Sequence, residues 1–241
     1  MRELIFLDTE ATGNEPSKDR LCQVCYKVGE GDTHVGYFKP PIPISVKAMS
    51  ITHITNKMVE NAEVFSSSKM KKDLEKLLQE GVLVAHTALF DIAMLKNEGL
   101  EVPRFIDTLR VVRYLDPENK VPEHNLQFLR YFLDLDVPGT AHDAEGDVNV
   151  LIALYQRLFA KVRESEASDE ATIDKMVEIS SRPTLFKNFI FGKYKGKPIA
   201  EVQKTDRRYM EWLLNQMTSE GEADTDEDWI YTLRHYLEKT V

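Results

Sequence analysis

Two acidic residues, Asp8 and Glu10, stand directly after a short apolar run, residues 4–7. The run is too short for a helix and is bounded by polar residues, so it predicts a buried strand at the centre of an α/β sheet. Side chains alternate along a strand, and both carboxylates are therefore expected on one side of the sheet. Such neighbours raise each other's pKa unless a cation lies between them, and Mg²⁺ suits that place. Taken alone, however, an Asp-x-Glu at a strand end is more often a solvated turn than a metal site.

Two more acidic residues lie where predicted strands end or predicted helices begin. Asp91 follows the apolar run 82–85 and lies in the first turns of a predicted helix, where ligands collect in open α/β sheets. Asp147 lies in a helical pattern whose apolar residues continue to Val162. His142 precedes Asp147 by five residues, on a predicted turn, and by itself it is compatible with a solvated loop histidine.

The elements between these residues predict a mixed sheet. Residues 21–28 and 33–38, separated by a glycine-containing loop, predict a β-hairpin. With the first strand, the hairpin forms an antiparallel start of three strands. Two more strands are expected at 82–85 and 105–108, with helices over residues 68–80, 109–114, 125–132 and 148–162. This alternation of strands and helices predicts an α/β fold.

Composition and charge narrow the class of protein. The 241 residues can form one large domain, or one medium and one small domain, and 42% apolar with 29% charged residues is ordinary for a soluble protein. The net charge of −9 argues against a broad basic surface that coats nucleic acid, but not against an enzyme that grips a strand end.

The cysteines, the length of the apolar runs and the first residues of the chain indicate the cellular compartment to expect. Cys22 and Cys25 have the spacing of a redox motif, but they lie in a strand-like run without a second cysteine pair, so ordinary strand positions are expected. No apolar run approaches the roughly 18 residues of a membrane span. The first residues enter a strand without room for a signal peptide. A cytoplasmic protein that does not contact a membrane is therefore expected.

Three motifs, in this order and spacing, resemble those of the DEDDh 3′–5′ exonucleases, the DnaQ-like family of the RNase H-like superfamily. They are Asp8-Thr9-Glu10-Ala11-Thr12-Gly13, Ala85-His86-Thr87-Ala88-Leu89-Phe90-Asp91 and His142-Asp143-Ala144-Glu145-Gly146-Asp147. The resemblance covers about residues 3–162 and implies an RNase H-like mixed five-stranded sheet flanked by helices. The chain departs from the family at Ala11, where Thr is common, and at Thr87, where Asn is usual.

The resemblance also implies a mechanism and a substrate site. Four carboxylates, those of Asp8, Glu10, Asp91 and Asp147, would hold two Mg²⁺ or Mn²⁺ ions, with Asp8 bridging both. One ion would activate water and the other would stabilise the leaving 3′ oxygen. His142 would take the proton from the attacking water. The residues implied to contact the terminal nucleotide are Thr9, Glu10, Ala11, Thr12, His86 and Phe90.

The last part of the chain differs in composition from the rest. Residues 164–183 are polar and predict a partly helical connector, which places an exonuclease domain at 1–163 and a small module at 184–241. The stretch 191–197 interleaves lysines with aromatic residues and lacks the order of a phosphate-binding P-loop. It would suit contact with nucleic acid, or equally a surface hairpin. The pattern of 191–214 is similar to the C-terminal module of bacterial exonuclease X-like proteins, which implies a small α+β module.

The resemblance as a whole implies a metal-dependent 3′→5′ exonuclease that releases 5′-mononucleotides from DNA, at single-stranded or frayed 3′ ends. An RNA exonuclease of the RNase T or oligoribonuclease type has the same motifs and is the first alternative. A catalytically silent module that binds nucleic acid or associates with a polymerase is the second. A polymerase or repair partner and the oligomeric state are left open.

Overall fold

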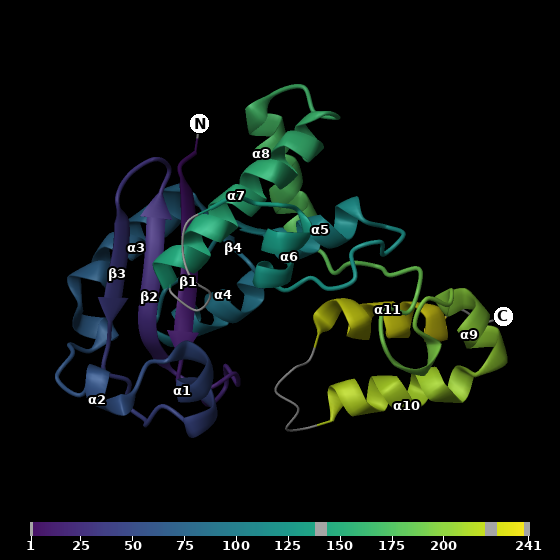
Figure 1. The fold of residues 1–241 in the computed structure, drawn as a ribbon, viewed down its shortest axis with the longest axis horizontal. Coiled ribbons are helices and arrows are strands. Elements are labelled where there is room, and N and C mark those ends of the chain that lie inside the picture. Colours follow the sequence, from purple (N-terminus) through teal and green to yellow (C-terminus); the bar gives the residue numbers. More distant parts are fainter. Residues whose placement is uncertain (1, 138–143, 220–225, 239–241) are drawn as a thin grey trace. The chain divides into compact units, whose positions relative to one another are not determined.

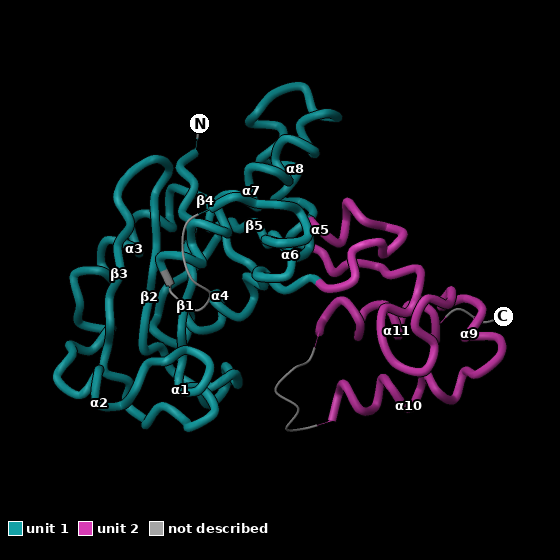
Figure 2. Tube along the Cα trace, in the orientation of Figure 1, with its two compact units in different colours: residues 1–111, 124–181 teal, residues 112–123, 182–241 magenta. Residues whose placement is uncertain are grey.

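The computed structural model describes residues 2–137, 144–219 and 226–238 (Figure 1). The chain forms two compact units, which are coloured separately in Figure 2. Unit 1 comprises residues 1–111 and 124–181, and unit 2 comprises residues 112–123 and 182–241. The chain passes from unit 1 to unit 2 within helix α5 (Thr108–Leu115) and is back in unit 1 before helix α6 (Leu126–Phe132).

A five-stranded mixed sheet in the order β3-β2-β1-β4-β5 forms the centre of unit 1. Strand β1 (Leu4–Ala11) pairs antiparallel with β2 (Leu21–Val28), which pairs antiparallel with β3 (Thr33–Tyr37). On its other edge β1 runs parallel to β4 (Val82–Ala85), and β4 runs parallel to β5 (Phe105–Asp107). The predicted five-stranded mixed sheet and its antiparallel start are thereby confirmed.

Helices cover both faces of this sheet (Figure 1). On one face, α3 (Lys69–Glu80) and α4 (Ala88–Asn97) share a hydrophobic core with Ile5 and Leu7 of β1. On the other face lies α7 (Ala144–Arg163), where the ring of Tyr155 meets Phe6 edge-on at a centroid distance of 5.3 Å. Because strand residues alternate, Asp8 and Glu10 point to the same side as Phe6, toward α7.

Short helices join β3 to α3, and side chains fix where they begin. Helix α1 (Val46–Thr52), helix α2 (Asn56–Val59) and α3 begin after Ser45, Thr55 and Ser68, whose hydroxyls accept backbone N–H groups. A 3₁₀ turn (Phe65–Ser67) precedes α3. Within the described ranges, no helix combines the length and apolar character needed to cross a bilayer.

The polar segment that follows α7 contains a helix, α8 (Asp169–Ser180), whose first turn is capped by Ser168. This helix packs against β5 and α7 in unit 1. The hydroxyl of Ser180 accepts the backbone N–H of Asp107 at 2.8 Å, and Arg110 donates to the Ser180 carbonyl at 2.8 Å. Helix α8 thus supports the end of β5, next to the edge of the sheet at which β1 and β4 end.

Unit 2 is built from helices around an aromatic core. Helices α9 (Ile199–Thr205), α10 (Arg207–Thr218) and α11 (Glu227–Glu238) follow a 3₁₀ turn (Gly192–Tyr194). Its only β pairing within the described residues is an isolated bridge between Asn188 and Pro198. Trp229 stacks between Phe186 and Phe189 in the core. The end of α5 is held here by buried Arg113, which pairs with Asp226 at 2.6 Å and Asp228 at 2.5 Å.

Candidate active site

Strand β1 brings two carboxylates to the end of the sheet, and its pairing with β2 is interrupted there. Glu10 pairs with Gln23 but Ala11 pairs with Leu21, so β2 carries one extra residue, Cys22, at this point. Such bulges twist a strand locally and occur often beside active sites. Burial and the Glu10 carboxylate raise the pKa of the Cys22 thiol to about 12, and neither cysteine forms a disulfide within the described residues.

Four acidic side chains from three elements share one electrostatic environment; we call Asp8, Glu10, Asp91 and Asp147 the carboxylate cluster. Burial raises the pKa of Asp8 well above its ordinary value, and the carboxylates of Asp91, Glu10 and Asp147 raise it further. Burial and the Asp147 carboxylate raise the pKa of Glu10 to about 7. The cluster therefore disfavours its own ionised form, as expected where a counter-charge is needed.

Asp91 enters the cluster from the first turn of α4 and is 4% exposed. Its Oδ1 accepts a hydrogen bond of 2.6 Å from the hydroxyl of Thr9 on β1, which fixes the carboxylate against the strand. Burial raises the pKa of Asp91 to about 7, assisted by the Asp107 carboxylate and opposed by the Thr9 hydrogen bond. Thr9, expected to contact substrate, thus uses its hydroxyl to position Asp91.

Asp147 enters from the first turn of α7 and is 8% exposed. The amide nitrogen Nε2 of Gln127, on α6, donates a 2.5 Å hydrogen bond to Asp147 Oδ1. The amide oxygen of Gln127 is buried and has no hydrogen-bond partner among the described residues. Gln127 was not predicted from the sequence, because α6 and α7 must first be packed together before this contact exists.

Asp107, at the end of β5, is a buried acid that the motif pattern does not include. Its Oδ1 accepts the backbone N–H groups of Thr87 and Leu109, both at 3.0 Å. Thr87 precedes α4 with φ +63°, in the left-handed region that Asn tolerates better than a β-branched residue. Asp107 therefore fixes the turn before α4, the helix that carries Asp91 in its first turn. The sequence feature that could have indicated Asp107 is its position at the end of a predicted strand.

Two other residues predicted to bind the nucleotide have buried side chains. Thr12 is 1% exposed; its hydroxyl donates to Asp19 at 2.7 Å and accepts the N–H of Arg20 at 3.1 Å. Ala11 is 4% exposed and belongs to the core below the sheet. Any contact of these two residues with substrate would consequently use their backbone.

The second motif places an aromatic and a histidine near Asp91. Phe90 is half-buried and packs against the core cluster of unit 1. Both ring nitrogens of His86 contact protein oxygens, Nδ1 the Thr108 hydroxyl at 2.9 Å and Nε2 the His124 carbonyl at 2.7 Å. Contact of His86 with substrate is thereby restricted to its ring face. His142, the predicted general base, lies outside the described residues.

The donor set of the cluster suits a hard divalent cation. All four side chains offer carboxylate oxygens, which Mg²⁺ and Mn²⁺ prefer, and a cation would relieve the repulsion that contributes to the raised pKa values of Asp8 and Glu10. No three His, Cys, Asp or Glu side chains in the described ranges form a ready-made metal site by themselves. Waters and substrate phosphate oxygens would complete the coordination, as is usual for Mg²⁺.

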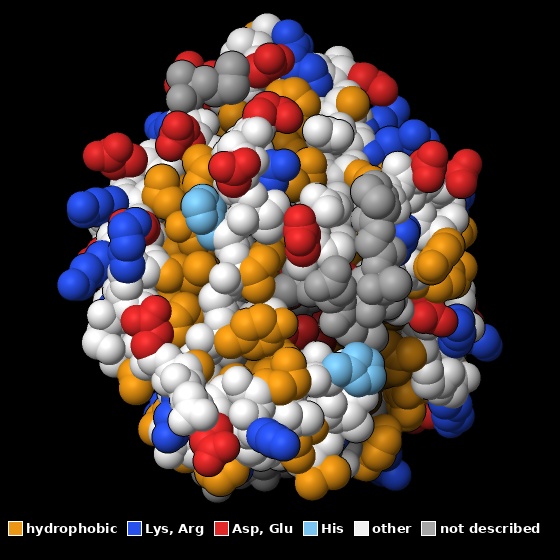
Figure 3. Space-filling view, turned by 60° about the vertical axis from the view of Figure 1, so that its left-hand side comes forward, with side chains coloured by type: hydrophobic (Ala, Val, Ile, Leu, Met, Phe, Trp, Pro, Cys, Tyr) orange, Lys and Arg blue, Asp and Glu red, His pale blue; other side chains and the backbone are white. Residues whose placement is uncertain are grey.

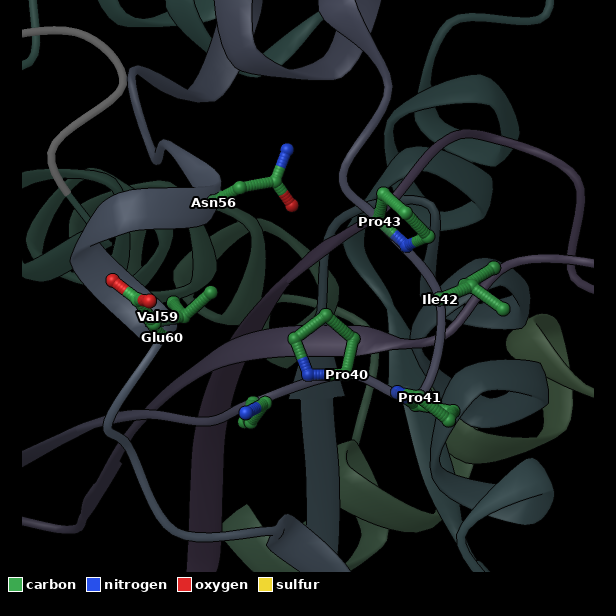
Figure 4. A pocket seen from close by; sticks show the side chains of 8 residues that line it. Pro40, Pro41, Ile42, Pro43, Asn56, Val59 and Glu60 are labelled. Carbon is green, nitrogen blue, oxygen red and sulfur yellow. The ribbon is translucent and has the colours of Figure 1, made fainter.

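The pocket drawn in Figure 4 is formed by the loop that follows β3 and by α2 with the residue after it. It is lined by Lys39, Pro40, Pro41, Ile42, Pro43, Asn56, Val59 and Glu60. The side chain of Asn56 accepts the N–H of Ile44 at 2.8 Å and donates to its carbonyl at 3.0 Å, which joins α2 to the proline-rich loop. The pocket includes none of the four carboxylates, so it is not the chemical site.

Positive charge does not gather into a single patch on the face drawn in Figure 3. Lysine and arginine side chains lie scattered there, mostly toward its edges, while hydrophobic side chains cover much of the centre. This distribution agrees with the net charge of −9. A ligand on this face would therefore not be held by a broad basic surface.

Metal binding is expected to stabilise the protein more at high pH than at low pH. Glu10 and Asp91 have folded-state pKa values of about 7, above unfolded values of about 4, so their contribution to stability is present below pH 4 and is lost as the pH rises through 7. A divalent cation offsets that loss. At 100 times its Kd, Mn²⁺ should raise Tm by about 5–10 °C at pH 8, and by much less at pH 5.5.

Differential scanning fluorimetry with Mn²⁺ or EDTA at both pH values measures this difference. The Glu10→Gln variant is the control, because the loss of one titrating carboxylate should reduce the pH dependence. An equal Tm increase at both pH values would show that the cation binds elsewhere.

Two family models match this chain. One, described as Exonuclease, covers residues 5–155, and the other, described as Exodeoxyribonuclease X-like C-terminal, covers residues 189–217. The chain is 30% identical to exodeoxyribonuclease 10 of Escherichia coli strain K12 over 245 residues, covering 98% of this chain and 100% of that protein. It is 28% identical to the 3′-5′ exonuclease DinG of Bacillus subtilis strain 168, over 68% of this chain and 18% of that protein.

Solved structures share the fold. Exonuclease X in complex with 5′ overhanging duplex DNA superposes with a TM-score of 0.55 and 23% identity, covering 72% of this chain and 99% of that chain. Exonuclease I of E. coli in complex with a dT13 oligonucleotide gives a TM-score of 0.56 and 19% identity, over 68% of this chain and 44% of that chain. These similarities confirm the predicted RNase H-like α/β fold.

Proposed function

Because the chain belongs to the exonuclease family, we propose that it is a metal-dependent 3′→5′ exonuclease that shortens DNA and releases 5′-mononucleotides. The observation that carries the proposal is the carboxylate cluster, whose four members come from β1, α4 and α7. Asp91, Glu10 and Asp147 all raise the pKa of Asp8, and Asp147 also raises that of Glu10. All four lie within the segment 5–155 that the exonuclease model matches. The catalytic domain in this proposal is residues 1–163, with residues 184–241 as a second module.

DNA is favoured over RNA as the substrate by two similarities. A relative that matches over 98% of the chain is an exodeoxyribonuclease, and residues 189–217 of the second module match the C-terminal segment of exodeoxyribonuclease X-like proteins. An RNA exonuclease of the RNase T type would retain the same carboxylate cluster. The substrate class therefore rests on these relatives, whereas the type of reaction rests on the cluster.

The proposed mechanism assigns each described residue a task. Asp8, Glu10, Asp91 and Asp147 would hold two Mg²⁺ or Mn²⁺ ions, which supply charge to stabilise the scissile phosphate and the leaving 3′ oxygen. Thr9 and Gln127 hold two of these carboxylates in place through their hydrogen bonds.

The remaining steps of the proposed mechanism are a proton transfer from the attacking water and cleavage of the phosphodiester bond. His142 would accept a proton from the water that attacks the terminal phosphorus, since an imidazole of pKa near 6.5 is suited to a general base. A bond forms between the water oxygen and phosphorus as the bond from phosphorus to the 3′ oxygen breaks. The leaving 3′ oxygen takes a proton from solvent, so the shortened strand ends in a 3′-hydroxyl and the released product is a 5′-mononucleotide.

Replacing Gln127 by Leu is expected to lower the exonuclease rate by about 10–100-fold, the usual effect of removing a group that orients a metal ligand. The reason is that Asp147 Oδ1 loses its 2.5 Å hydrogen bond while all four carboxylates remain. Steady-state rates on a single-stranded oligonucleotide measure the effect. Gln127→Glu, which places a further negative charge beside Asp147, should be at least as impaired. An unaltered rate in Gln127→Leu would show that Asp147 needs no such support.

Digestion of matched DNA and RNA oligonucleotides tests the proposed substrate. The two strands should have the same sequence and length, and the products should be separated as 5′-mononucleotides. Faster release from DNA supports the proposal, and faster release from RNA supports the RNA exonuclease instead, because the 2′-hydroxyl is the group that differs. Binding of either strand without release would favour a catalytically silent module.

A further inference from the structure

Unit 2 exposes a large aromatic side chain on helix α10: Trp212 is 54% exposed to solvent. The chain's other tryptophan, Trp229, is 2% exposed and forms part of the core. Tryptophan carries a large apolar surface, and an exposed one is typical of binding surfaces. Trp212 therefore marks a place where a ligand would gain contact area.

Trp212 ends a row of aromatic rings that begins in the core of unit 2. The ring centroid of Tyr209 lies 5.8 Å from that of Trp212, and Tyr194 lies 5.1 Å from Tyr209. Buried Phe189 contacts both tyrosine rings. The rings of this row are therefore already packed against one another. A flat ligand that stacks on them would lose little binding free energy to the ordering of protein side chains.

Positive charge borders this row of rings. Asp206 holds the ammonium of Lys193 at 3.0 Å, and that ammonium lies 4.8 Å from the ring centroid of Tyr194. Arg208 precedes Trp212 by four residues in α10, so the two side chains are neighbours on the helix surface. Residues 187–212 contain seven Lys or Arg and three Asp or Glu, a net charge of +4 in a chain of −9.

The glycine-lysine stretch that precedes α9 helps to build this surface. Gly192 has φ +70°, and a Cβ there would lie 2.6 Å from the Tyr209 hydroxyl, so the turn fits closely against that ring. The hydroxyl of Tyr194 donates to Asp206 at 2.6 Å, and Asp206 also caps α10. The stretch thus fixes Lys193 and Tyr194 beside the aromatic row.

We propose that Lys193, Tyr194, Arg208, Tyr209 and Trp212, here called the Trp212 face, bind single-stranded nucleic acid. One base stacks on Trp212, and the backbone phosphates lie beside Lys193 and Arg208. Aromatic platforms flanked by cations are the means by which proteins hold single strands without reading their sequence. The inference rests on the proposed function, because the strand held by unit 2 would be the substrate of the carboxylate cluster.

Binding of a 20-nucleotide oligothymidylate to the full-length protein in EDTA, where cleavage is stopped, tests this face. Trp212→Ala should weaken binding about fivefold or more, the loss of one stacked base, and Trp212→Phe should weaken it less. Tyr231→Ala is the matched control, since Tyr231 is an exposed aromatic of unit 2 outside the face. Arg208→Ala should reduce the salt dependence of log K by about 0.7, the value for one phosphate of a single strand.

Fluorescence gives a second measurement in the same titration. With excitation selective for tryptophan, stacking should quench the emission of Trp212, and this quenching should be absent in Trp212→Phe, in which buried Trp229 is the one remaining tryptophan. The same series with oligouridylate tests whether the face accepts RNA as well. Equal affinity of Trp212→Ala and the unaltered protein, without quenching, would overturn the inference.

Mononucleotide release from the same oligothymidylate, measured with Mg²⁺, separates this inference from the proposed function. If the strand is degraded and Trp212→Ala binds it as well as the unaltered protein does, the proposed exonuclease function stands and the inference about the Trp212 face is rejected. If the strand binds through Trp212 but no mononucleotide is released, the inference about the Trp212 face stands and the proposed exonuclease function is rejected.

Discussion

Asp8→Asn is expected to lower mononucleotide release by about 10⁴-fold or more, the scale on which a member of a catalytic unit is lost. Asp8 is the member of the cluster whose pKa the carboxylates of Asp91, Glu10 and Asp147 all raise. An amide oxygen in place of a carboxylate removes the charge through which a divalent cation would be held. Single-turnover release from a labelled oligonucleotide measures the loss.

The same substitution should stabilise the metal-free protein. Removing one ionisable group from a buried set of carboxylates relieves the cost of ionising them together, so at pH 8 Tm in EDTA should rise while activity disappears. Opposite changes in stability and activity separate a lost ligand from a misfolded protein. Asp73→Asn is the control, since Asp73 forms a surface ion pair with Lys69 and has no part in the cluster. Near-normal release by Asp8→Asn would reject the metal assignment.

His142→Ala is expected to slow catalysis by about 10²–10⁴-fold while metal binding is retained, which is the usual cost of losing a general base. His142 and Asp147 have the spacing of the third motif, and Asp147 lies in the cluster. The release rate and the Mn²⁺-induced increase in Tm should be measured on the same preparation. The role as a base predicts a fall in the rate with an unchanged Tm increase.

A different result for His142→Ala would change its role. If the Tm increase were lost together with the rate, His142 would be a metal ligand, and the proton would have to be accepted by another group. If the rate were unchanged, His142 would have no part in the chemistry. The comparison with Asp8→Asn, in which both quantities should change, gives the reference for a lost ligand.

Regular patterns in the sequence predicted much of the fold. The alternation of Phe6, Asp8 and Glu10 placed the two acids on one side of β1, and Phe6 does meet Tyr155 of α7 on that side. The strands expected at 82–85 and 105–108 are the parallel strands β4 and β5, and β5 ends one residue earlier than expected, at Asp107. These elements depend on local periodicity, which is readable without knowledge of the packing.

The supports of the site depend on packing and were not predicted. Gln127 reaches Asp147 only after α6 and α7 are packed together, and Asp107 reaches the Thr87 N–H only because β4 and β5 are paired. The sequence shows that Thr87 stands where the family usually has Asn, but the consequence of this difference is seen only in the backbone. The φ angle of Thr87 is +63°, and this left-handed conformation costs about 1 kcal/mol of conformational free energy for a residue with a Cβ.

Release of label from single-stranded DNA carrying a 3′ or a 5′ terminal label, with Mg²⁺, with Mn²⁺ and with EDTA, tests the central claim most directly. The proposed function predicts that the 3′ label appears first, as a 5′-mononucleotide, and the carboxylate cluster predicts that this release occurs with either cation and not with EDTA. Release that starts at the 5′ label, or that continues unchanged in EDTA, would contradict a metal-dependent 3′→5′ exonuclease.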